Sequence, residues 1–267
     1  MAGHSHWSSI KHKKGAADAK RGKLFSKLAK HIMVAARNGG GNPADNLPLR
    51  YAIEKARAEF MPKDSILRAV KKGTGELEGG SLEELSYEGI GPGGISFILE
   101  ILTDNRNRTA SEVRNLIEKR GGNLGKSGSV TWKFDRRGIL EISTEAISED
   151  ELFEVVTEAG AEDLVAEDDF FQITTTVENL EAVRGAIQDA VDAKNPKEEK
   201  AWGESDDEAP LFSRHEIAWI PQTLLPLEGK DAEPAVGFLN VLEEHDDVQN
   251  LWCDLEVPEG IGDVEEA

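Results

Sequence analysis

The sequence has little cysteine and no long apolar run. Its 267 residues include one cysteine, Cys253, so no disulfide can form within the chain. The longest apolar stretch, residues 95–102, is interrupted by Ser96 and Glu100 and is far shorter than the roughly 18–20 residues of a membrane-spanning helix. The polar, basic N-terminus lacks the apolar core of a secretion signal. We therefore expect a cytoplasmic protein with reduced thiols and no membrane partner.

Signatures of common catalytic and metal sites are also absent. Neither a Ser/His/Asp nucleophile motif nor a phosphate-binding P-loop is present. The histidines and Cys253 lack the spacing of a zinc finger. Asp104, Asp246 and Asp247 could hold a catalytic metal only if they fold together, and the last two belong to an acidic run typical of a solvated helix end. The sequence thus predicts a non-enzymatic protein without catalytic residues, metal or cofactor.

The charges are distributed unevenly along the chain. The formal net charge is −20, from 51 acidic and 31 basic side chains. Residues 1–72 contain 16 Lys/Arg and 5 Asp/Glu, whereas residues 73–267 contain 15 Lys/Arg and 46 Asp/Glu. A basic segment on an acidic chain predicts that the basic part binds a polyanion. We also hypothesise that the acidic part, especially 136–210, competes with nucleic acid for it.

The basic segment has the pattern of three helices. The first is predicted from Ala16 to Asn38 and ends at a run of glycines. The second, 47–60, can be capped by Asn46, and the third runs from Pro62 to Gly73. On the first helix, one face is apolar and the opposite face is cationic. The cationic face comprises Lys20, Lys23, Lys27, Lys30, His31 and Arg37.

The remaining sequence alternates strand and helix patterns. A first unit has a buried strand at 95–102, a helix from a Thr109–Glu112 capping box to Arg120, and a strand at 129–134 with Val130, Trp132 and Phe134 on one side. A second unit has the β–α–β–β–α order of a ferredoxin-like domain. Its elements are predicted at 138–142, 148–160, 162–167, 170–177 and 180–191. A solvated loop at 194–210, a strand at 216–220, a helix at 233–243 and a strand at 249–257 follow. The predicted fold class is α+β.

Several separated motifs resemble the YebC/PmpR family, which includes the mitochondrial translational activator of cytochrome oxidase subunit one. The motifs are AGHSHW (2–7), IKHKKGAADAKRGKLF (10–25), MPKD (61–64), EGIGPGG (88–94), TDNRNRT (103–109) and DDVQ (246–249). The chain departs from the family at Ser9, which replaces the usual Asn, in a longer 194–210 loop, and in its strongly acidic composition.

The resemblance implies three domains. They are a basic helical nucleic-acid-binding domain (1–75), a discontinuous α/β domain (76–135 with 211–258) and an inserted ferredoxin-like α/β domain (136–210), before a disordered tail (259–267). It also implies a nucleic-acid-binding regulator of gene expression. Some relatives are described as DNA-binding transcriptional regulators and others as translation factors at the ribosome.

The candidate nucleic-acid-binding residues form two groups. The first group binds phosphates and comprises Lys11, Lys13, Lys14, Lys20, Arg21, Lys23, Lys27 and Lys30. His6 and Trp7 could stack on an unpaired base, although Trp7 could equally anchor the N-terminal arm on the helices. Arg21 lies toward the apolar side of its helix and could instead pair with an acid.

The second group is Asn105, Arg106, Asn107 and Arg108, where a strand leads into a helix N-terminus that favours anions. Arg106 and Arg108 would contact the nucleic acid. The alternative is a loop held by Asn-mediated turns, with Arg106 paired to acids.

Three functions remain open at this point. We predict a monomeric, DNA-binding transcriptional regulator, with an RNA- or ribosome-binding translation factor as the alternative. The second needs only shape, phosphate and single-strand contacts, whereas the first lacks a recognisable helix-turn-helix or zinc finger. A third possibility is a protein-interaction module whose acidic part binds a basic partner.

Overall fold

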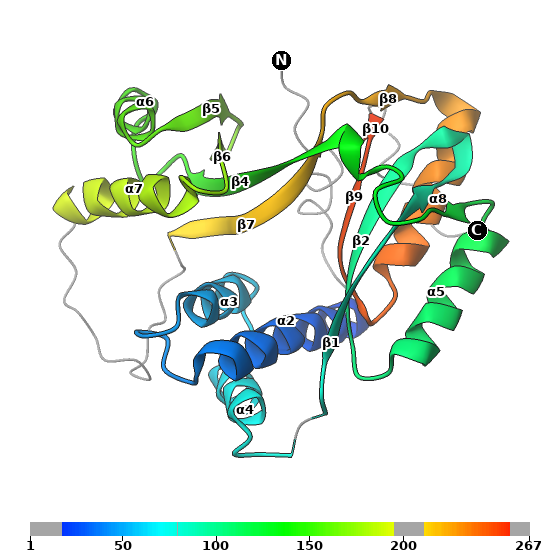
Figure 1. Cartoon of the computed structure of the whole chain (residues 1–267). Coiled ribbons are helices and arrows are strands. Elements are labelled where there is room, and N and C mark those ends of the chain that lie inside the picture. The colour runs from blue at the N-terminus through cyan, green and yellow to red at the C-terminus, as the bar shows by residue number, and fades with distance from the viewer. Residues whose placement is uncertain (1–17, 79, 195–210, 257–267) are drawn as a thin grey trace. The chain divides into compact units, whose positions relative to one another are not determined.

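The computed structural model describes residues 18–78, 80–194 and 211–256, with side chains from Arg21 onward. The chain forms two compact units, each assembled from separate stretches (Figure 1). Within the described ranges, unit 1 comprises 18–27, 80–135 and 219–256, and unit 2 comprises 28–78, 136–194 and 211–218. None of the helices in these ranges is long and apolar enough to cross a membrane.

Unit 1 contains a four-stranded antiparallel sheet in the order β3-β1-β2-β9. Its strands are β1 (Glu83–Ile90), β2 (Ser96–Thr103), β3 (Asn123–Leu124) and β9 (Val248–Cys253). The prediction of β2 is confirmed within one residue at each end, whereas β1 was not predicted. The central position of β2 explains its nearly continuous burial, since both of its edges are paired and its apolar side chains enter the core.

Two helices complete the core of unit 1. They are α5 (Arg106–Lys119) and α8 (Ala232–Glu243). Val113 and Ile117 of α5 and Phe238 of α8 join Phe97 and Leu99 of β2 in one buried cluster. A short parallel pair, β8 (Leu225–Pro226) with β10 (Leu255–Glu256), lies outside this sheet. Single-turn 3₁₀ helices at Pro92–Gly94, Thr131–Lys133 and Gly229–Asp231 connect the elements.

Among the described residues, three helices precede the first strand, in agreement with the prediction for this region. They are α2 (Asp18–Gly39), which begins in unit 1 and continues into unit 2, α3 (Leu47–Ala58) and α4 (Lys63–Thr74). The Asn46 side chain caps α3 by accepting a hydrogen bond from the Leu49 amide at 3.2 Å. Beyond α2, Gly40 has a φ of +87°, which favours glycine at this helix end. The buried residues Leu28, Ile32 and Ala36 of α2 confirm the predicted apolar face.

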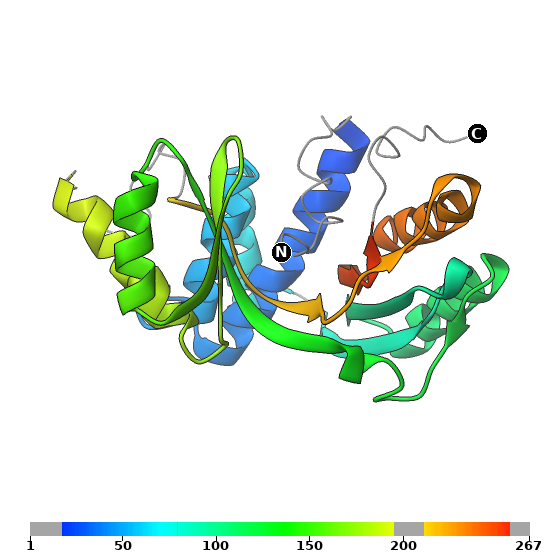
Figure 2. The ribbon, with the colours of Figure 1, turned by 90° about the horizontal axis from the view of Figure 1, so that it is seen from above.

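The second part of unit 2 is a four-stranded sheet in the order β5-β6-β4-β7, covered by two helices (Figure 2). Its elements are β4 (Phe134–Ser143), α6 (Glu149–Glu158), β5 (Ala161–Ala166), β6 (Phe170–Thr175), α7 (Leu180–Lys194) and β7 (Phe212–Pro221). The predicted β–α–β–β–α order is confirmed, and β7 completes the ferredoxin-like arrangement by lying beside β4.

Partly buried ion pairs connect α3 to this sheet and its helices. The Arg184 guanidinium on α7 lies 2.9 Å from the Glu54 carboxylate on α3. The Lys55 ammonium lies 2.8 Å from Glu216 on β7. Removing one partner of such a pair is destabilising, because it leaves a partly buried charge without compensation.

The fold class is confirmed as α+β, with an N-terminal helical region followed by strand-containing regions. The division into three domains stays a prediction. The predicted 194–210 loop, except its first residue, and the predicted tail lie outside the described residues.

Candidate nucleic-acid interface

The predicted phosphate-binding residues fall into described and undescribed parts. His6, Trp7, Lys11, Lys13 and Lys14 lie outside the described residues. Lys20 is in the first turn of α2, but its side chain is not described. The structure therefore shows four of the predicted N-terminal cations, namely Arg21, Lys23, Lys27 and Lys30.

These four side chains follow the helical pattern of α2 only in part. Arg21 and Lys23 are exposed, whereas Lys27 and Lys30 are half-buried. Arg21 forms no ion pair with another described residue, so the described structure gives no support to the alternative that it pairs with an acid. The exposed cations lie within the first turns of α2, before its apolar residues become fully buried at Leu28.

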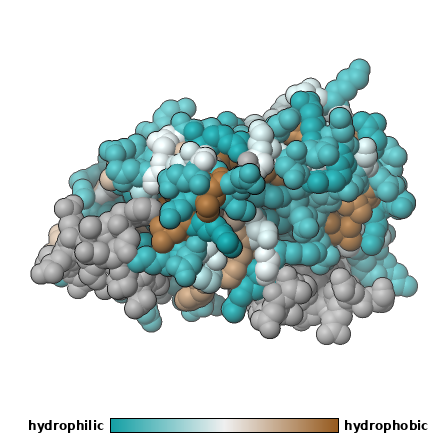
Figure 3. Space-filling model, turned by 90° about the horizontal axis from the view of Figure 1, so that it is seen from below, coloured by the Kyte–Doolittle hydropathy of each residue, from teal (hydrophilic) through white to brown (hydrophobic). Residues whose placement is uncertain are grey.

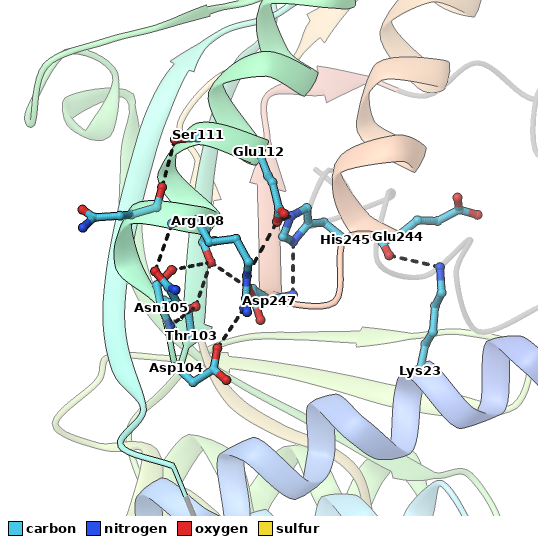
Figure 4. Close-up of polar contacts among 12 residues, drawn as sticks. Lys23, Thr103, Asp104, Asn105, Arg108, Ser111, Glu112, Glu244, His245 and Asp247 are labelled. Carbon is cyan, nitrogen blue, oxygen red and sulfur yellow. Dashed lines mark hydrogen bonds and ion pairs between the residues drawn. The ribbon is translucent and has the colours of Figure 1, made fainter.

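Lys23 and Lys27 also contact the C-terminal end of α8, and Figure 4 shows the contact of Lys23. Lys23 Nζ donates to the Glu244 carbonyl oxygen at 3.4 Å, and Lys27 Nζ donates to the Glu243 carbonyl oxygen at 2.5 Å. Free carbonyl groups at a helix C-terminus carry partial negative charge and attract cations. Lys23 uses one of its three N–H donors there, so its ammonium keeps donors for a phosphate.

The second predicted group lies at the start of α5 (Figure 4). The predicted capping box at Thr109 and Glu112 is wrong, because α5 begins three residues earlier. Asn105 is the N-cap, and its side-chain oxygen accepts from the Arg108 amide at 3.1 Å. Thr109 is buried inside the first turn, where its hydroxyl donates to the Asp247 carboxylate at 2.6 Å. Thr109 therefore has a buried partner, Asp247, which directly precedes β9, and Asn105 caps the helix instead.

Arg108 is held by two carboxylates. Its Nη2 donates to Asp104 at 2.8 Å and to Asp247 at 3.1 Å. These two hydrogen bonds, the one to Asp247 first, raise the pKa of Arg108 above its ordinary value. Arg106 is exposed and forms no ion pair with another described residue. The alternative expectation had paired Arg106 with acids, but the structure pairs Arg108 instead, one helical turn away from Asp104.

Two of the three acids considered for a metal site belong to this cluster. Asp104 and Asp247 both lie against the same guanidinium, which compensates their charge. His245 Nδ1 accepts from the Asp247 amide at 3.1 Å, which leaves its Nε2 facing Glu112 at 3.3 Å. Across the described ranges, no group of three His, Cys, Asp or Glu side chains could hold a metal ion.

A further exposed feature was misread in the sequence. The sequence predicts a strand at 129–134 with Trp132 on the same side as Val130 and Phe134, but Thr131–Lys133 form a 3₁₀ turn and β4 begins only at Phe134. The turn rotates Trp132 outward, and its exposed fraction is 68%, whereas Val130 and Phe134 are buried. The glycines at 125 and 128 are the signal that could have revealed a loop here.

The carboxylate of Glu88 on β1 holds this loop. It accepts from the amides of Val130 and Thr131 at 2.7 and 2.9 Å, from the Thr131 hydroxyl at 2.7 Å, and from the Gly128 amide. Burial alone would raise the pKa of Glu88, but these donors outweigh it and lower that pKa below its ordinary value. The loop therefore has a defined conformation although its residues are exposed.

One face of the molecule is predominantly hydrophilic. On the face shown in Figure 3, apolar side chains form separate areas among polar ones. Exposed large apolar residues elsewhere include Phe60 on the turn after α3 and Phe153 on α6. Scattered apolar residues of this kind are normal on a protein surface and do not define an interface.

Comparison with known proteins identifies the family. Residues 5–76 match the family description "TACO1/YebC protein N-terminal domain", and residues 82–255 match "TACO1/YebC second and third domain". The chain belongs to the TACO1/YebC family. This confirms the resemblance drawn from the sequence motifs.

Relatives within the TACO1/YebC family match over nearly the whole chain. A protein of Desulforapulum autotrophicum is 49% identical over 99% of this chain and 100% of its own length. One of Trichlorobacter lovleyi is 49% identical over 96% of both chains. Both are named "probable transcriptional regulatory protein". The crystal structure of the conserved hypothetical protein Aq1575 from Aquifex aeolicus matches with a TM-score of 0.79 and 42% identity, covering 98% of this chain and all of that one.

Proposed function

We propose that this TACO1/YebC protein is a non-enzymatic regulator of gene expression that binds nucleic acid through the cationic residues at the start of α2. The first candidate target is duplex DNA, as the names of the relatives suggest for a transcriptional regulator. The observation that carries the proposal is the exposure of Arg21 and Lys23 on a helix that buries Leu28, Ile32 and Ala36.

The spacing of these cations suits a phosphate backbone. Lys20, Lys23, Lys27 and Lys30 recur every three or four residues, so they follow one side of the helix with about 5–6 Å between neighbouring Cβ atoms. Such a row can contact several successive phosphates without reading the base sequence. The sequence places Lys11, Lys13 and Lys14 immediately before the helix, which extends the cationic stretch.

Arg106 and Arg108 contribute differently in this proposal. Arg106 is exposed at the N-terminus of α5, so it is available for a phosphate. Arg108 is bound by Asp104 and Asp247, so its main role is to position the α5 N-terminus. We therefore retain Arg106 as a contact residue and assign Arg108 a supporting role.

The second candidate is a translation factor that binds RNA or the ribosome. The exposed Trp132 favours it, because proteins that recognise single-stranded RNA commonly stack its unpaired bases on aromatic side chains. Single-stranded loops and ends offer such bases, whereas the bases of duplex DNA are stacked on one another.

The proposal is tested by charge reversal at α2. The full chain carrying Lys20→Glu, Lys23→Glu, Lys27→Glu and Lys30→Glu is titrated against labelled duplex DNA, single-stranded RNA and ribosomes between 50 and 200 mM salt. Each lost phosphate contact should reduce the slope of log affinity against log salt by about 0.9 on duplex DNA. We expect near-complete loss of binding with helicity preserved by circular dichroism.

The matched control reverses four cations on another helix of the same region. Lys63→Glu, Arg68→Glu, Lys71→Glu and Lys72→Glu on α4 change the net charge equally. Equal losses in the two variants would show a non-specific charge effect and would refute the assignment to α2. The probe that wild type binds most tightly at 200 mM salt distinguishes the DNA candidate from the RNA and ribosome candidate.

A further inference from the structure

The loop before β4 presents an aromatic ring in an unusual setting. Trp132 lies on the 3₁₀ turn Thr131–Lys133, with 68% of its surface exposed, between the buried residues Val130 and Phe134. The two neighbours anchor the turn in the core of the protein. Exposing a large apolar ring to water costs free energy. Here the burial of Val130 and Phe134 keeps the Trp132 ring on the surface.

The indole ring is also held in position by hydrogen bonds. Its Nε1 donates to the Ser129 carbonyl oxygen at 3.0 Å, and the Ser129 amide donates to the Lys126 carbonyl oxygen at 2.9 Å. The Glu88 carboxylate fixes the backbone on both sides of Ser129. Because the only polar atom of the ring has a partner, a ligand could cover the ring without stripping that atom of a bond to water. A fixed ring also loses little conformational freedom on binding.

The loop geometry depends on two glycines. Gly128 has a φ of +86°, a conformation that other residues rarely adopt. A side chain on Gly125 would meet Ser129 Oγ at 1.9 Å. The loop is therefore built to a specific shape, with small residues around the ring.

The stretch of sequence that contains Trp132 is cationic and polar. Residues 113–134 contain five Lys/Arg and one acidic residue, although residues 73–267 as a whole are strongly acidic. Lys133 Nζ lies 6.0 Å from the Trp132 ring centroid, and Lys126 is exposed with no ion pair to another described residue. The buried centre of a protein–protein interface is rich in apolar side chains. The exposed residues 125–129 are instead glycine, serine and lysine. Cations beside an exposed aromatic ring match single-stranded nucleic acid.

We propose that Trp132 is a stacking site for an unpaired nucleobase of single-stranded nucleic acid, with Lys126 contacting an adjoining phosphate. This inference rests on the proposed nucleic-acid-binding function and adds a second contact region to it. Within this region Lys133 supports the ring rather than the ligand, since its ammonium also lies 2.7 Å from Ser96 Oγ and 3.5 Å from Asp254.

The test measures affinity of the full chain for three labelled probes of one sequence: single-stranded RNA, single-stranded DNA and duplex DNA. Trp132→Ala should weaken binding of single strands by about 5- to 150-fold, which is the usual contribution of one stacked base, and change duplex binding by less than about twofold. Trp132→Phe should retain most of the affinity because it keeps an aromatic face. Lys126→Ala should reduce the salt slope on single strands by about 0.7.

The control is Phe153→Ala, which removes an aromatic ring of 58% exposure from the acidic helix α6 and should leave all affinities unchanged.

The outcomes for Trp132→Ala distinguish the possibilities. Loss of affinity for both single-stranded probes supports recognition of the base alone, and loss of affinity for RNA alone supports a site that also reads the ribose. If wild type binds the single strands and Trp132→Ala binds them equally well, the stacking site is refuted while the proposed function stands. If Trp132→Ala instead weakens only self-association in sedimentation, the ring is a protein contact and the inference is wrong. Failure of wild type to bind any probe would refute the proposed function itself.

Discussion

Replacing Glu88 with alanine should release the loop that carries Trp132. The carboxylate is buried and accepts four hydrogen bonds, three from backbone amides and one from the Thr131 hydroxyl. A hydrogen bond to a charged group contributes about 1.5–3 kcal/mol, so full loss of all four would cost about 6–12 kcal/mol. Gly128 is exposed and Thr131 half-buried, so water can replace part of the lost acceptor. We therefore expect a loss of about 3–5 kcal/mol in the free energy of unfolding.

Amide hydrogen exchange measures this effect locally. The amides of Gly128, Val130 and Thr131 should exchange much faster in Glu88→Ala, whereas those of β2 should change less. Glu88→Gln keeps one carbonyl acceptor but turns an amide group toward the backbone donors, so its effect should be intermediate. Glu84→Ala, on an exposed position of the same strand, is the matched control and should change stability by less than about 0.5 kcal/mol. Unchanged protection of the three amides in Glu88→Ala would refute the assignment of the carboxylate as the anchor of the loop.

Three further predictions concern other side chains. Arg108→Ala should lower the thermal unfolding midpoint, because it removes the guanidinium beside the buried Asp247 carboxylate. Arg106→Ala should leave that midpoint unchanged and weaken nucleic-acid binding. The reverse pattern would contradict the roles assigned to these two residues. Burial, with the nearby Arg184 and other cations, lowers the pKa of His215 to about 4, so between about pH 6.5 and 4 the unfolded state binds the additional proton. Stability should therefore be full above pH 6.5 and fall by up to about 3 kcal/mol toward pH 4, and urea unfolding of His215→Gln should lack this part of the pH dependence. Glu88 affects stability at more acidic pH, because its pKa is lowered in the folded state. The stabilisation from its carboxylate is present above about pH 4.5 and is lost as the pH falls through the folded-state pKa. The stability of Glu88→Gln should not show this loss at acidic pH.

The sequence was most informative where local signals and burial agree. Helix α2 has an apolar face and glycines at its end, and strand β2 is a nearly continuous apolar run, so both were predicted closely. Strand β1 was missed because it alternates exposed and half-buried residues and is stabilised by pairing with β2 and β3. A strand with so few buried side chains has little hydrophobic pattern to detect.

By itself, the sequence determined the α+β class, the family and the cationic character of the N-terminal region, because composition, periodicity and ordered motifs are properties of the chain. Only the tertiary structure decided the roles of individual polar residues. Arg108 is bound because Asp247, 139 positions away in the chain, lies beside α5, and Trp132 is exposed because Glu88 on a separate strand holds its loop. Contacts between residues distant in the chain leave no local sequence pattern, so charge and aromaticity alone could not distinguish a binding residue from a supporting one.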